Sequence, residues 1–247
     1  MSVLAELRDG SLVLTLNRPT AGNSLNPAVG QGLVDALADA ATNPEVRSII
    51  VTGAGEKVFC AGMDLKAFAA GEDMTLVGTG LSMLAACPKP VIAAVNGHAV
   101  AGGFEVMMRC DLVVAADHAR FGIPEVKRGL VAAGGGTTLP RRIPLGVALE
   151  LGLTGETMSA QRAMELGLVN RVVPAAEVMH AAFALAALIN VNGPLAVQAT
   201  KRLMLEEVGQ DNTAHIREVT GPVFASADAR EGAVAFAEKR PPVWQGH

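Results

Sequence analysis

The stretch V-I-A-A-V-N-G-H-A-V-A-G-G-F-E-V-M-M-R-C-D, residues 91–111, decides the predicted fold. Its apolar start predicts a buried strand that ends at Asn96-Gly97. After a loop, Gly102-Gly103 opens a segment whose apolar residues recur at helical spacing. A glycine pair at a helix start leaves backbone N–H groups accessible at the positive end of the helix dipole, and Glu105 lies in that first turn. This pattern fits an anion-stabilising site with an acid or base beside it, and equally a tight turn with a favourable charge.

The composition is that of a globular chain. Of 247 residues, 50% are apolar and 18% are charged, so we expect one large domain, or one domain with an appendage. A net charge of −4 argues against a nucleic-acid partner. Cys60, Cys87 and Cys110 lack metal-ligand spacing and are interpreted as reduced, mostly buried thiols of a cytoplasmic protein. Because we find neither a signal peptide nor about 18 consecutive apolar residues, we expect a soluble protein without a membrane partner.

Outward from this stretch, strands and helices alternate. Asp9-Gly10 between two alternating runs predicts a hairpin, and Asn26-Pro27 predicts a helix start. A short strand after Lys57 leads through Gly62 to a helix capped by Asp64. Residues 71–80 are expected to form a loop. Further strands are predicted at 48–51, 112–116 and 169–173, with helices at 79–86, 146–153, 159–166, 174–190, 194–208, 212–226 and 228–238 and from Gly134-Gly135-Gly136.

This order of elements favours an α/β fold with a largely parallel sheet. The last helices form an appendage that packs back onto the core or onto a neighbour. An appendage of that kind indicates an oligomer.

Several familiar chemistries have no motif in the chain. We find no phosphate-binding loop, no dinucleotide-binding glycine fingerprint after a strand, and no nucleophile elbow of a serine hydrolase. His98 is a lone histidine in a predicted loop, where a structural role is favoured over a general base. His118 and His215 have no evident partner. No group of side chains has metal-ligand spacing, so a metal is not expected.

Two carboxylates remain, Glu105 and Glu125, each beside a glycine-rich turn. A pair on either side of a small pocket can hold one water and divide the acid and base roles, provided that their environments separate their pKa values. Both residues can also be surface charges. The residue types alone favour the catalytic pair only slightly.

A series of motifs, in order, resembles the crotonase (enoyl-CoA hydratase/isomerase) family over essentially the whole chain. No single motif is specific, but their combination is. The motifs are N-R-P at 17–19, F-C-A-G-M-D-L at 59–65, A-A-V-N-G-H-A-V-A-G-G-F-E at 93–105, F-G-I-P-E-V at 121–126, L-T-G-E at 153–156, S-A-Q-R-A-M-E-L-G-L-V-N at 159–170 and D-A-R-E-G-A-V-A-F-A-E-K-R at 228–240.

The resemblance implies an α/β spiral of ββα units with a C-terminal helical trimerisation region. Residues 1–190 would form the core, and residues 191–247 would assemble a homotrimer or a dimer of trimers. The substrate would be an acyl-CoA thioester. Coenzyme A is then part of the substrate, so no separate cofactor is expected.

The resemblance also assigns catalytic roles. The backbone N–H groups of Met63 and Gly102 would form an oxyanion hole for the thioester enolate. Glu105, as the ionised base, would activate water for attack at Cβ, and protonated Glu125 would deliver a proton to Cα. These assignments imply an enoyl-CoA hydratase of fatty-acid or related acyl-CoA degradation, that is, a lyase.

Contacts to coenzyme A are implied as well. The backbones of Ala21 and Ala61 would reach the adenine end. Lys57 and Lys66 would meet phosphates and Lys239 a neighbouring subunit's ligand, although a solvated surface lysine is an equal alternative for each.

The remaining implied ligand contacts are Asp64 and Ala133. Two departures from the family pattern accompany them. Gly22 stands where many members carry a larger or basic residue. Ala132-Ala133 replaces the Pro-Gly common in hydratases, next to the expected water, and so weakens the expectation of an efficient hydratase.

Two alternatives to the hydratase remain open. A carnitinyl-CoA-type or other 3-hydroxyacyl-CoA dehydratase needs the same two glutamates. A non-catalytic acyl-CoA binding protein would keep the pocket and lose the chemistry.

Overall fold

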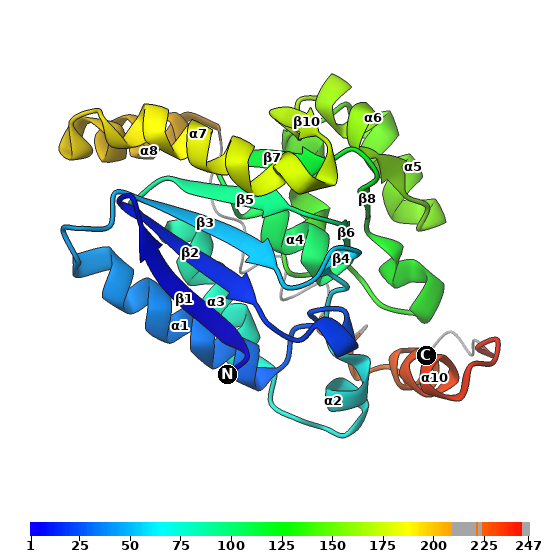
Figure 1. Cartoon of the computed structure of the whole chain (residues 1–247). Helices are drawn as coiled ribbons and strands as arrows, with labels where there is room; N and C mark the ends of the chain where they lie inside the picture. The colour runs from blue at the N-terminus through cyan, green and yellow to red at the C-terminus, as the bar shows by residue number, and fades with distance from the viewer. Residues whose placement is uncertain (209–220, 222–223, 244–247) are drawn as a thin grey trace.

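A six-stranded sheet forms the centre of the computed structural model, which describes residues 1–208, 221 and 224–243 (Figure 1). Its strands in spatial order are β1 (Val3–Arg8), β2 (Ser11–Leu16), β3 (Ser48–Gly53), β5 (Val91–Val95), β7 (Leu112–Ala116) and β10 (Arg171–Val173). The predicted hairpin joins β1 and β2 antiparallel, with positive φ at both Asp9 and Gly10 as a primed turn requires. All other neighbours pair in parallel, so the largely parallel sheet is confirmed.

A smaller sheet lies beside the first one. It consists of β4 (Val58–Cys60), β6 (His98–Val100), β8 (Arg120–Gly122) and β9 (Met158–Ser159). Three times the chain passes from a strand of the large sheet to one of the small sheet: β3 to β4, β5 to β6, and β7 to β8. The β6 strand corrects one prediction, because His98 lies in a strand and not in a loop. Strand–strand–helix units therefore repeat along the chain as a spiral.

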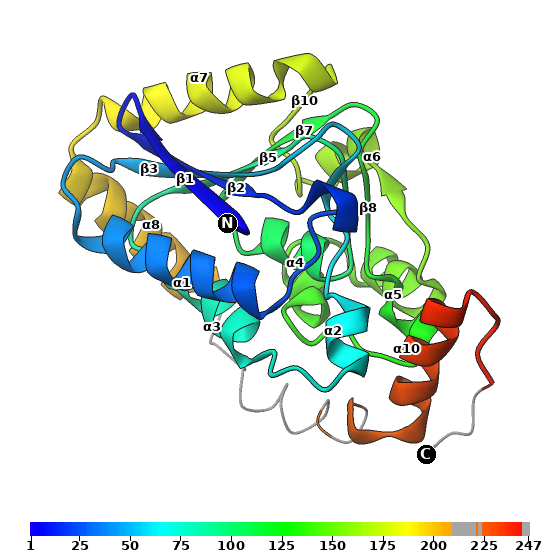
Figure 2. The ribbon, with the colours of Figure 1, turned by 60° about the horizontal axis from the view of Figure 1, so that its bottom comes forward.

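Helices cover both faces of the large sheet (Figure 2). On one face, α1 (Pro27–Thr42) packs against α3 (Thr75–Ala86), and on the other α7 (Val178–Asn190) lies across β3, β5 and β7. The predicted cap of α1 is confirmed, because the Asn26 side chain accepts a hydrogen bond from Val29 N–H at 3.0 Å. Helix α4 (Gly102–Met108) follows β6 and is buried along most of its length.

The prediction of a loop at residues 71–80 is wrong from Thr75 onward. Helix α3 starts there, after the Asp73 side chain accepts a hydrogen bond from Thr75 N–H at 2.9 Å. Glycine at 78 and 80 made the segment resemble a loop. A Cβ on Gly80 would stand only 3.1 Å from the Leu33 side chain, so the glycine permits close approach to α1.

The remaining elements are helices in the predicted order, together with short 3₁₀ turns, of which the two before residue 130 were not predicted. They are η1 (Pro19–Ala21), α2 (Leu65–Ala69), η2 (Pro124–Arg128), η3 (Gly136–Arg141), α5 (Leu145–Thr154), α6 (Ala160–Glu165), η4 (Ala175–Glu177), α8 (Pro194–Val208) and α10 (Ala227–Glu238). The glycine triplet opens the 3₁₀ turn η3 rather than an α-helix, and the predicted helix 174–190 begins as the 3₁₀ turn η4. The predicted helix at 212–226 lies largely outside the described residues.

The C-terminal helices reach two separate places. Lys201 ties α8 to the core through a 2.6 Å ion pair with Asp111. Helix α10 packs beside α2 and η2 at the opposite end (Figures 1 and 2). In the described part of the chain, no single helix has the length and apolar character of a membrane span. Only the bent pair 175–190 and 194–205, broken at 106°, meets that criterion, by length and composition alone.

Candidate functional site

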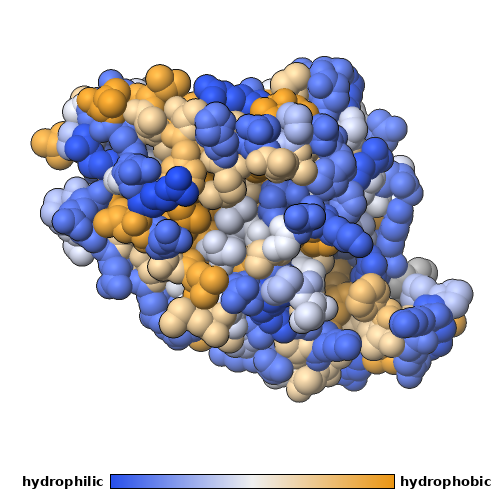
Figure 3. All heavy atoms as spheres, viewed as in Figure 1, coloured by the Kyte–Doolittle hydropathy of each residue, from blue (hydrophilic) through white to orange (hydrophobic). Residues whose placement is uncertain are grey.

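A cavity of about 800 Å³ lies between α2, α3, the start of α4, η2 and α10. Figure 3 shows a hollow between the body of the molecule and the lobe that carries α10, with apolar side chains gathered around it. Most of the predicted site residues line this cavity: Ala21, Ala61, Met63, Asp64, Lys66, Gly102, Glu105, Glu125 and Ala133. The fold thus brings the two glutamates and both predicted oxyanion donors to one place.

Met63 and Gly102 lie side by side. A Cβ added to Gly102 would stand 3.3 Å from Met63 N, a tight contact, so glycine favours this close approach. Leu25 pairs with Met63 in a parallel bridge whose two hydrogen bonds use Gly62 O and Asp64 N–H. The N–H of Met63 therefore points away from Leu25. Gly102 is the first residue of α4, where a helical N–H has no partner within the helix.

The turn before Gly102 is strained. Ala101 has φ +51° and ψ −131°, a conformation that residues with a side chain rarely adopt and that costs of order 1–3 kcal/mol. A hydrogen bond of 2.9 Å from Ala101 N–H to Gly122 O helps to hold it. The sharp turn lets a short strand of the small sheet run directly into a helix whose N-terminus borders the cavity.

Glu105 is buried beside backbone hydrogen-bond donors. It is 6% exposed, and its Oε1 accepts a hydrogen bond from Gly136 N–H at 2.9 Å. Burial raises the pKa of Glu105, while the backbone N–H groups of Gly136 and Gly134 and the charge of Arg109 counteract that rise. The carboxylate therefore has donors that stabilise its charged form.

Glu125 has a different environment. Burial, followed by repulsion from Glu105, raises its pKa to about 8, although the charge of Arg128 counteracts the rise. Its Oε2 atom is buried and accepts no hydrogen bond from any residue that the structure describes. With that pKa, Glu125 is protonated at neutral pH. Two carboxyl groups in such unlike environments can act as base and acid.

Arg18 and Asp64 fix the segment that carries Met63. The Arg18 guanidinium donates to Asp64 Oδ2 at 2.9 Å and to the Ser24 carbonyl at 2.7 Å. Asp64 Oδ1 caps α2 by accepting from the N–H groups of Lys66 and Ala67. Desolvation opposes ionisation of Asp64, but the hydrogen bond from Arg18 and the capping N–H groups outweigh it and hold its pKa below the usual value. The predicted cap is confirmed.

Lys57 is exposed, and neither it nor Lys239 lines the cavity. Their contacts, to phosphates and to a neighbouring subunit's ligand respectively, stay predictions. The N–H of Ala133, a residue expected to lie next to the water, donates to Val131 O at 2.8 Å. Gly22 adopts φ +58° as the cap of η1, a left-handed conformation that favours glycine at this position.

His98 and His118 do not line the cavity. His98 Nδ1 accepts a hydrogen bond from Arg120 N–H at 3.2 Å. Its ring meets the edge of His118, and His118 also lies 3.6 Å from Asp117, so the expectation that His118 lacks a partner is wrong. His215 is outside the described residues. Within those residues, no group of three or more His, Cys, Asp or Glu side chains could hold a metal ion.

Sequence reasoning missed four residues of the site. Gly134 and Gly136 supply N–H groups to Glu105, and a Cβ on Gly134 would collide with Glu105 Oε2. Arg109 binds Gly134 O at 2.8 Å and so fixes that loop. Arg128 lines the cavity one turn after Glu125. The three-residue spacing between Glu125 and Arg128 is visible in the sequence and could have indicated this position. The contacts of Gly134, Gly136 and Arg109 depend on the tertiary structure.

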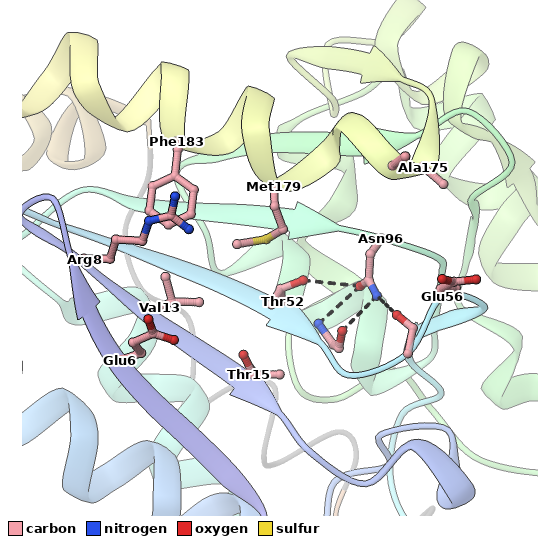
Figure 4. A pocket seen from close by; sticks show the side chains of 13 residues that line it. Glu6, Arg8, Val13, Thr15, Thr52, Glu56, Asn96, Ala175, Met179 and Phe183 are labelled. Atoms are coloured by element: carbon pink, nitrogen blue, oxygen red, sulfur yellow. Dashed lines mark hydrogen bonds between the residues drawn. The ribbon is translucent and has the colours of Figure 1, made fainter.

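A second cavity of about 570 Å³ lies between the large sheet and α7 (Figure 4). Its apolar wall includes Phe183, over which the Arg8 guanidinium is placed at 4.7 Å. Asn96 makes three hydrogen bonds there with the backbone of Gly53 and Gly55, which join the ends of β3 and β5. The Asn96 side-chain amide in this cavity thus has a structural role, in holding the ends of these two strands together.

Known proteins resemble this chain over nearly its whole length. The sequence profile of the family described as Enoyl-CoA hydratase/isomerase matches residues 6–247. Carnitinyl-CoA dehydratase from Escherichia coli O157:H7 is 42% identical over 253 residues, 97% of each chain. (E)-Benzylidenesuccinyl-CoA hydratase from Thauera aromatica is 38% identical over 257 residues, 100% of each chain.

A solved structure extends the comparison to the fold. Enoyl-CoA hydratase from Mycobacterium tuberculosis H37Rv matches with a TM-score of 0.81 at 50% identity and covers 100% of this chain and 99% of that one. The names of all three relatives describe hydratases or dehydratases of CoA thioesters. The chain therefore has the crotonase fold and belongs to the enoyl-CoA hydratase/isomerase family of hydratases and dehydratases.

Proposed function

We propose that this protein is an enoyl-CoA hydratase that adds water in syn geometry across the 2,3 double bond of a trans-2-enoyl-CoA. One observation carries the proposal. Two carboxyl groups with unlike environments, Glu105 and Glu125, line the same cavity as Met63 and Gly102. That set contains a base, an acid and two backbone donors, which is what hydration of a conjugated thioester requires.

In this proposal the thioester oxygen accepts hydrogen bonds from the N–H groups of Met63 and Gly102. Negative charge builds on that oxygen as water attacks Cβ and the enolate forms. Donors fixed by the backbone need no reorganisation during the reaction, and loss of one such donor typically costs ~3–4 kcal/mol. Because the donors are backbone N–H groups, the side chain at residue 63 contributes little to stabilisation of the oxyanion.

The proton transfers follow from the two environments. Glu105, whose ionised form accepts from Gly136 N–H, removes a proton from the water. Glu125, whose pKa is raised to about 8, delivers its proton to Cα. The pair carries one proton before the reaction, on Glu125, and one after it, on Glu105. Transfer of this proton from Glu105 to Glu125 restores the starting state. The reaction needs no cofactor, because coenzyme A is part of the substrate.

The same site can run in reverse as a 3-hydroxyacyl-CoA dehydratase. The similarity to a carnitinyl-CoA dehydratase favours this second candidate. A non-catalytic acyl-CoA binding protein is the third, and the occupied N–H of Ala133 is the observation that favours it.

One assay distinguishes the three. Purified protein is mixed with crotonyl-CoA and longer trans-2-enoyl-CoAs, and loss of the conjugated thioester absorbance is followed; 3-hydroxyacyl-CoAs, including carnitinyl-CoA, are tested in the reverse direction. We expect turnover that falls by at least about 100-fold in Glu105→Gln and in Glu125→Gln. The exposed Glu150→Gln is the matched control and should keep full activity. Tight binding of acyl-CoA without turnover in either direction would contradict the hydratase and the dehydratase alike.

We further propose that residues 191–247 assemble a homotrimer or a dimer of trimers. Exposed apolar side chains on α8 support this assembly. The three free, buried cysteines fit a reducing compartment, so we place the protein in the cytoplasm, in fatty-acid or related acyl-CoA degradation.

A further inference from the structure

We propose that Arg128 selects the acyl group, and that the preferred substrates are enoyl-CoAs whose acyl chain ends in a carboxylate. The inference rests on the proposed hydratase function and extends it to a substrate class. Arg128 lines the same cavity as the two glutamates. It is the side chain on η2 whose charge opposes the rise in the pKa of Glu125.

The 3₁₀ geometry of η2 fixes the position of Arg128. Side chains three residues apart in a 3₁₀ helix are eclipsed, so Glu125 and Arg128 lie on the same side, one above the other. One turn rises about 6 Å. The distance to be bridged is the rise along η2 from the level of Glu125 to that of Arg128. In a bound enoyl group whose carboxylate lies three bonds beyond Cβ, the acyl chain would span much of this distance. The long Arg128 side chain can span the rest.

The guanidinium of Arg128 has no carboxylate partner among the described residues. Of the described residues, two other cations line the cavity: Arg18, which pairs with Asp64 at 2.9 Å, and Lys66, which is exposed. Arg128, in contrast, is half-buried and makes no ion pair with any described side chain. A partly desolvated guanidinium that lacks an anion is a good receptor for a carboxylate, which it can bind in a bidentate manner.

Helix α10 holds the guanidinium in place. The Phe236 ring lies 4.7 Å from Arg128 Cζ and is itself part of the cavity wall. Gly232 lets α10 approach η2 closely, because a Cβ there would collide with the Arg128 carbonyl. Phe224 packs against Phe68 of α2 with ring centroids 6.3 Å apart. The end of the cavity thus combines apolar walls with one fixed positive charge.

Each of the other acidic groups that line the cavity has a partner, a proton or solvent. Glu105 accepts a hydrogen bond from Gly136 N–H, and Asp64 is paired with Arg18. Glu125 is protonated at neutral pH, and Glu72 is exposed. A substrate with a quaternary ammonium on its acyl group would instead meet the Arg128 charge directly. We therefore expect discrimination against cationic acyl groups.

Three enoyl-CoAs that differ in terminal charge test the inference. They are 5-carboxy-2-pentenoyl-CoA, the neutral trans-2-hexenoyl-CoA of matched length, and the cationic crotonobetainyl-CoA. For the wild type we expect kcat/KM to be about 10- to 100-fold higher for the carboxylate than for the neutral substrate, the range of hydrogen bonds to charged groups. Crotonobetainyl-CoA should be the poorest substrate.

Arg128→Met should abolish this preference, mainly through a higher KM for the carboxylate substrate. Any effect of the lost charge on Glu125 acts on both substrates, so the ratio between them isolates recognition. Arg128→Lys should restore part of the ratio, since it keeps the charge without the bidentate fork. Lys127→Met is the matched control, because Lys127 is exposed, pairs with Glu156 and does not line the cavity.

Binding separates failure of this inference from failure of the proposed function. If no enoyl-CoA is turned over, the hydratase proposal fails. The Kd values of the saturated adipyl-CoA and hexanoyl-CoA, measured by calorimetry, then decide the role of Arg128. Equal affinities, or an unchanged ratio in Arg128→Met, would overturn it whether or not the protein is an enzyme.

Discussion

Burial makes Glu125 an acid that is neutral near pH 7, and this has a cost in stability at higher pH. Its pKa is raised from 4.5 to about 8 in the folded protein. Between those values the unfolded chain has lost the proton and the folded chain keeps it, so stability falls as pH rises from about 4.5 to about 8. The penalty is absent below this window and constant above it.

Glu125→Gln removes the titrating group, and its effect on stability should therefore depend on pH. We expect the free energy of unfolding of the variant, relative to wild type, to increase by on the order of 3–4 kcal/mol between pH 5 and pH 8. Urea unfolding at several pH values measures this difference. Glu150→Gln, at an exposed position, is the control and should show no such trend. A difference that stays flat with pH would mean that Glu125 is ionised in the folded protein.

The same proton predicts the pH profile of activity. The proposed mechanism needs one proton on the glutamate pair, so kcat/KM for hydration should fall as pH rises through about 8. A second fall is expected on the acid side, where both carboxyl groups become protonated. Rates measured with crotonyl-CoA from pH 5 to pH 10 test the profile. A rate that still rises above pH 9 would exclude Glu125 as the acid.

Gly134 is a residue whose small size serves the chemistry. A Cβ at this position would collide with Glu105 Oε2, so Gly134→Ala should displace the carboxylate and lower kcat by at least about 10-fold. Gly146→Ala is the matched control. A Cβ on Gly146 meets open space in helix α5, and the change should leave activity intact and stabilise the fold by up to about 1 kcal/mol. Equal activity of both variants would show that Glu105 needs no space at Gly134.

For individual residues, the sequence predicted the site residues that lie within the family motifs. Met63, Gly102, Glu105 and Glu125 were predicted together and do line one cavity. Arg109 and Gly134 were not predicted, because their role depends on a loop meeting α4 across tertiary space. The backbone conformation that directs the Ala133 N–H to Val131 O could not be predicted from the sequence either.

Among the elements, the α1–α3 pair shows how packing can override local propensity. Glycine disfavours a helix interior by about 1 kcal/mol, and on that basis residues 71–80 were predicted as a loop. The helix α3 forms because its close packing against α1 offsets this cost. A Cβ on Gly30 of α1 would stand 2.5 Å from the Leu76 carbonyl carbon and from Val77 N, both backbone atoms of α3. Such proximity cannot be read from a single segment.

This packing gives a prediction for the pair of helices. Gly30→Ala should force α1 and α3 apart and lower the free energy of unfolding by about 2–4 kcal/mol. Gly78→Ala, within α3 itself, should be neutral or stabilising by up to about 1 kcal/mol, because a Cβ there meets nothing within 4 Å. Both values come from urea denaturation with an unchanged slope. Equal effects of the two substitutions would mean that the helices can move apart without cost.

For the whole molecule, the element order predicted the architecture better than it predicted element ends. The apolar runs at 48–51, 91–95 and 112–116 are long enough to specify three central parallel strands, and all three are buried. The small sheet was harder to foresee, because β6 and β8 are only three residues each and carry no clear alternation. Their pairing depends on the turns that follow the larger strands, and those turns also place the site.

The assembly of several chains is a prediction for the whole molecule that remains to be tested. Helix α8 exposes large apolar side chains, with Leu195 81%, Leu203 61% and Met204 65% exposed. A lone chain rarely leaves such a group in water, so we expect these residues to be buried against a second copy. Sedimentation equilibrium should give a trimer or a hexamer. The double variant Leu203→Glu and Met204→Glu should shift it to the monomer mass by burying charges at the contact, whereas Leu4→Glu, at an exposed site on β1, should not. A wild-type monomer at micromolar concentration would contradict the proposed role of residues 191–247.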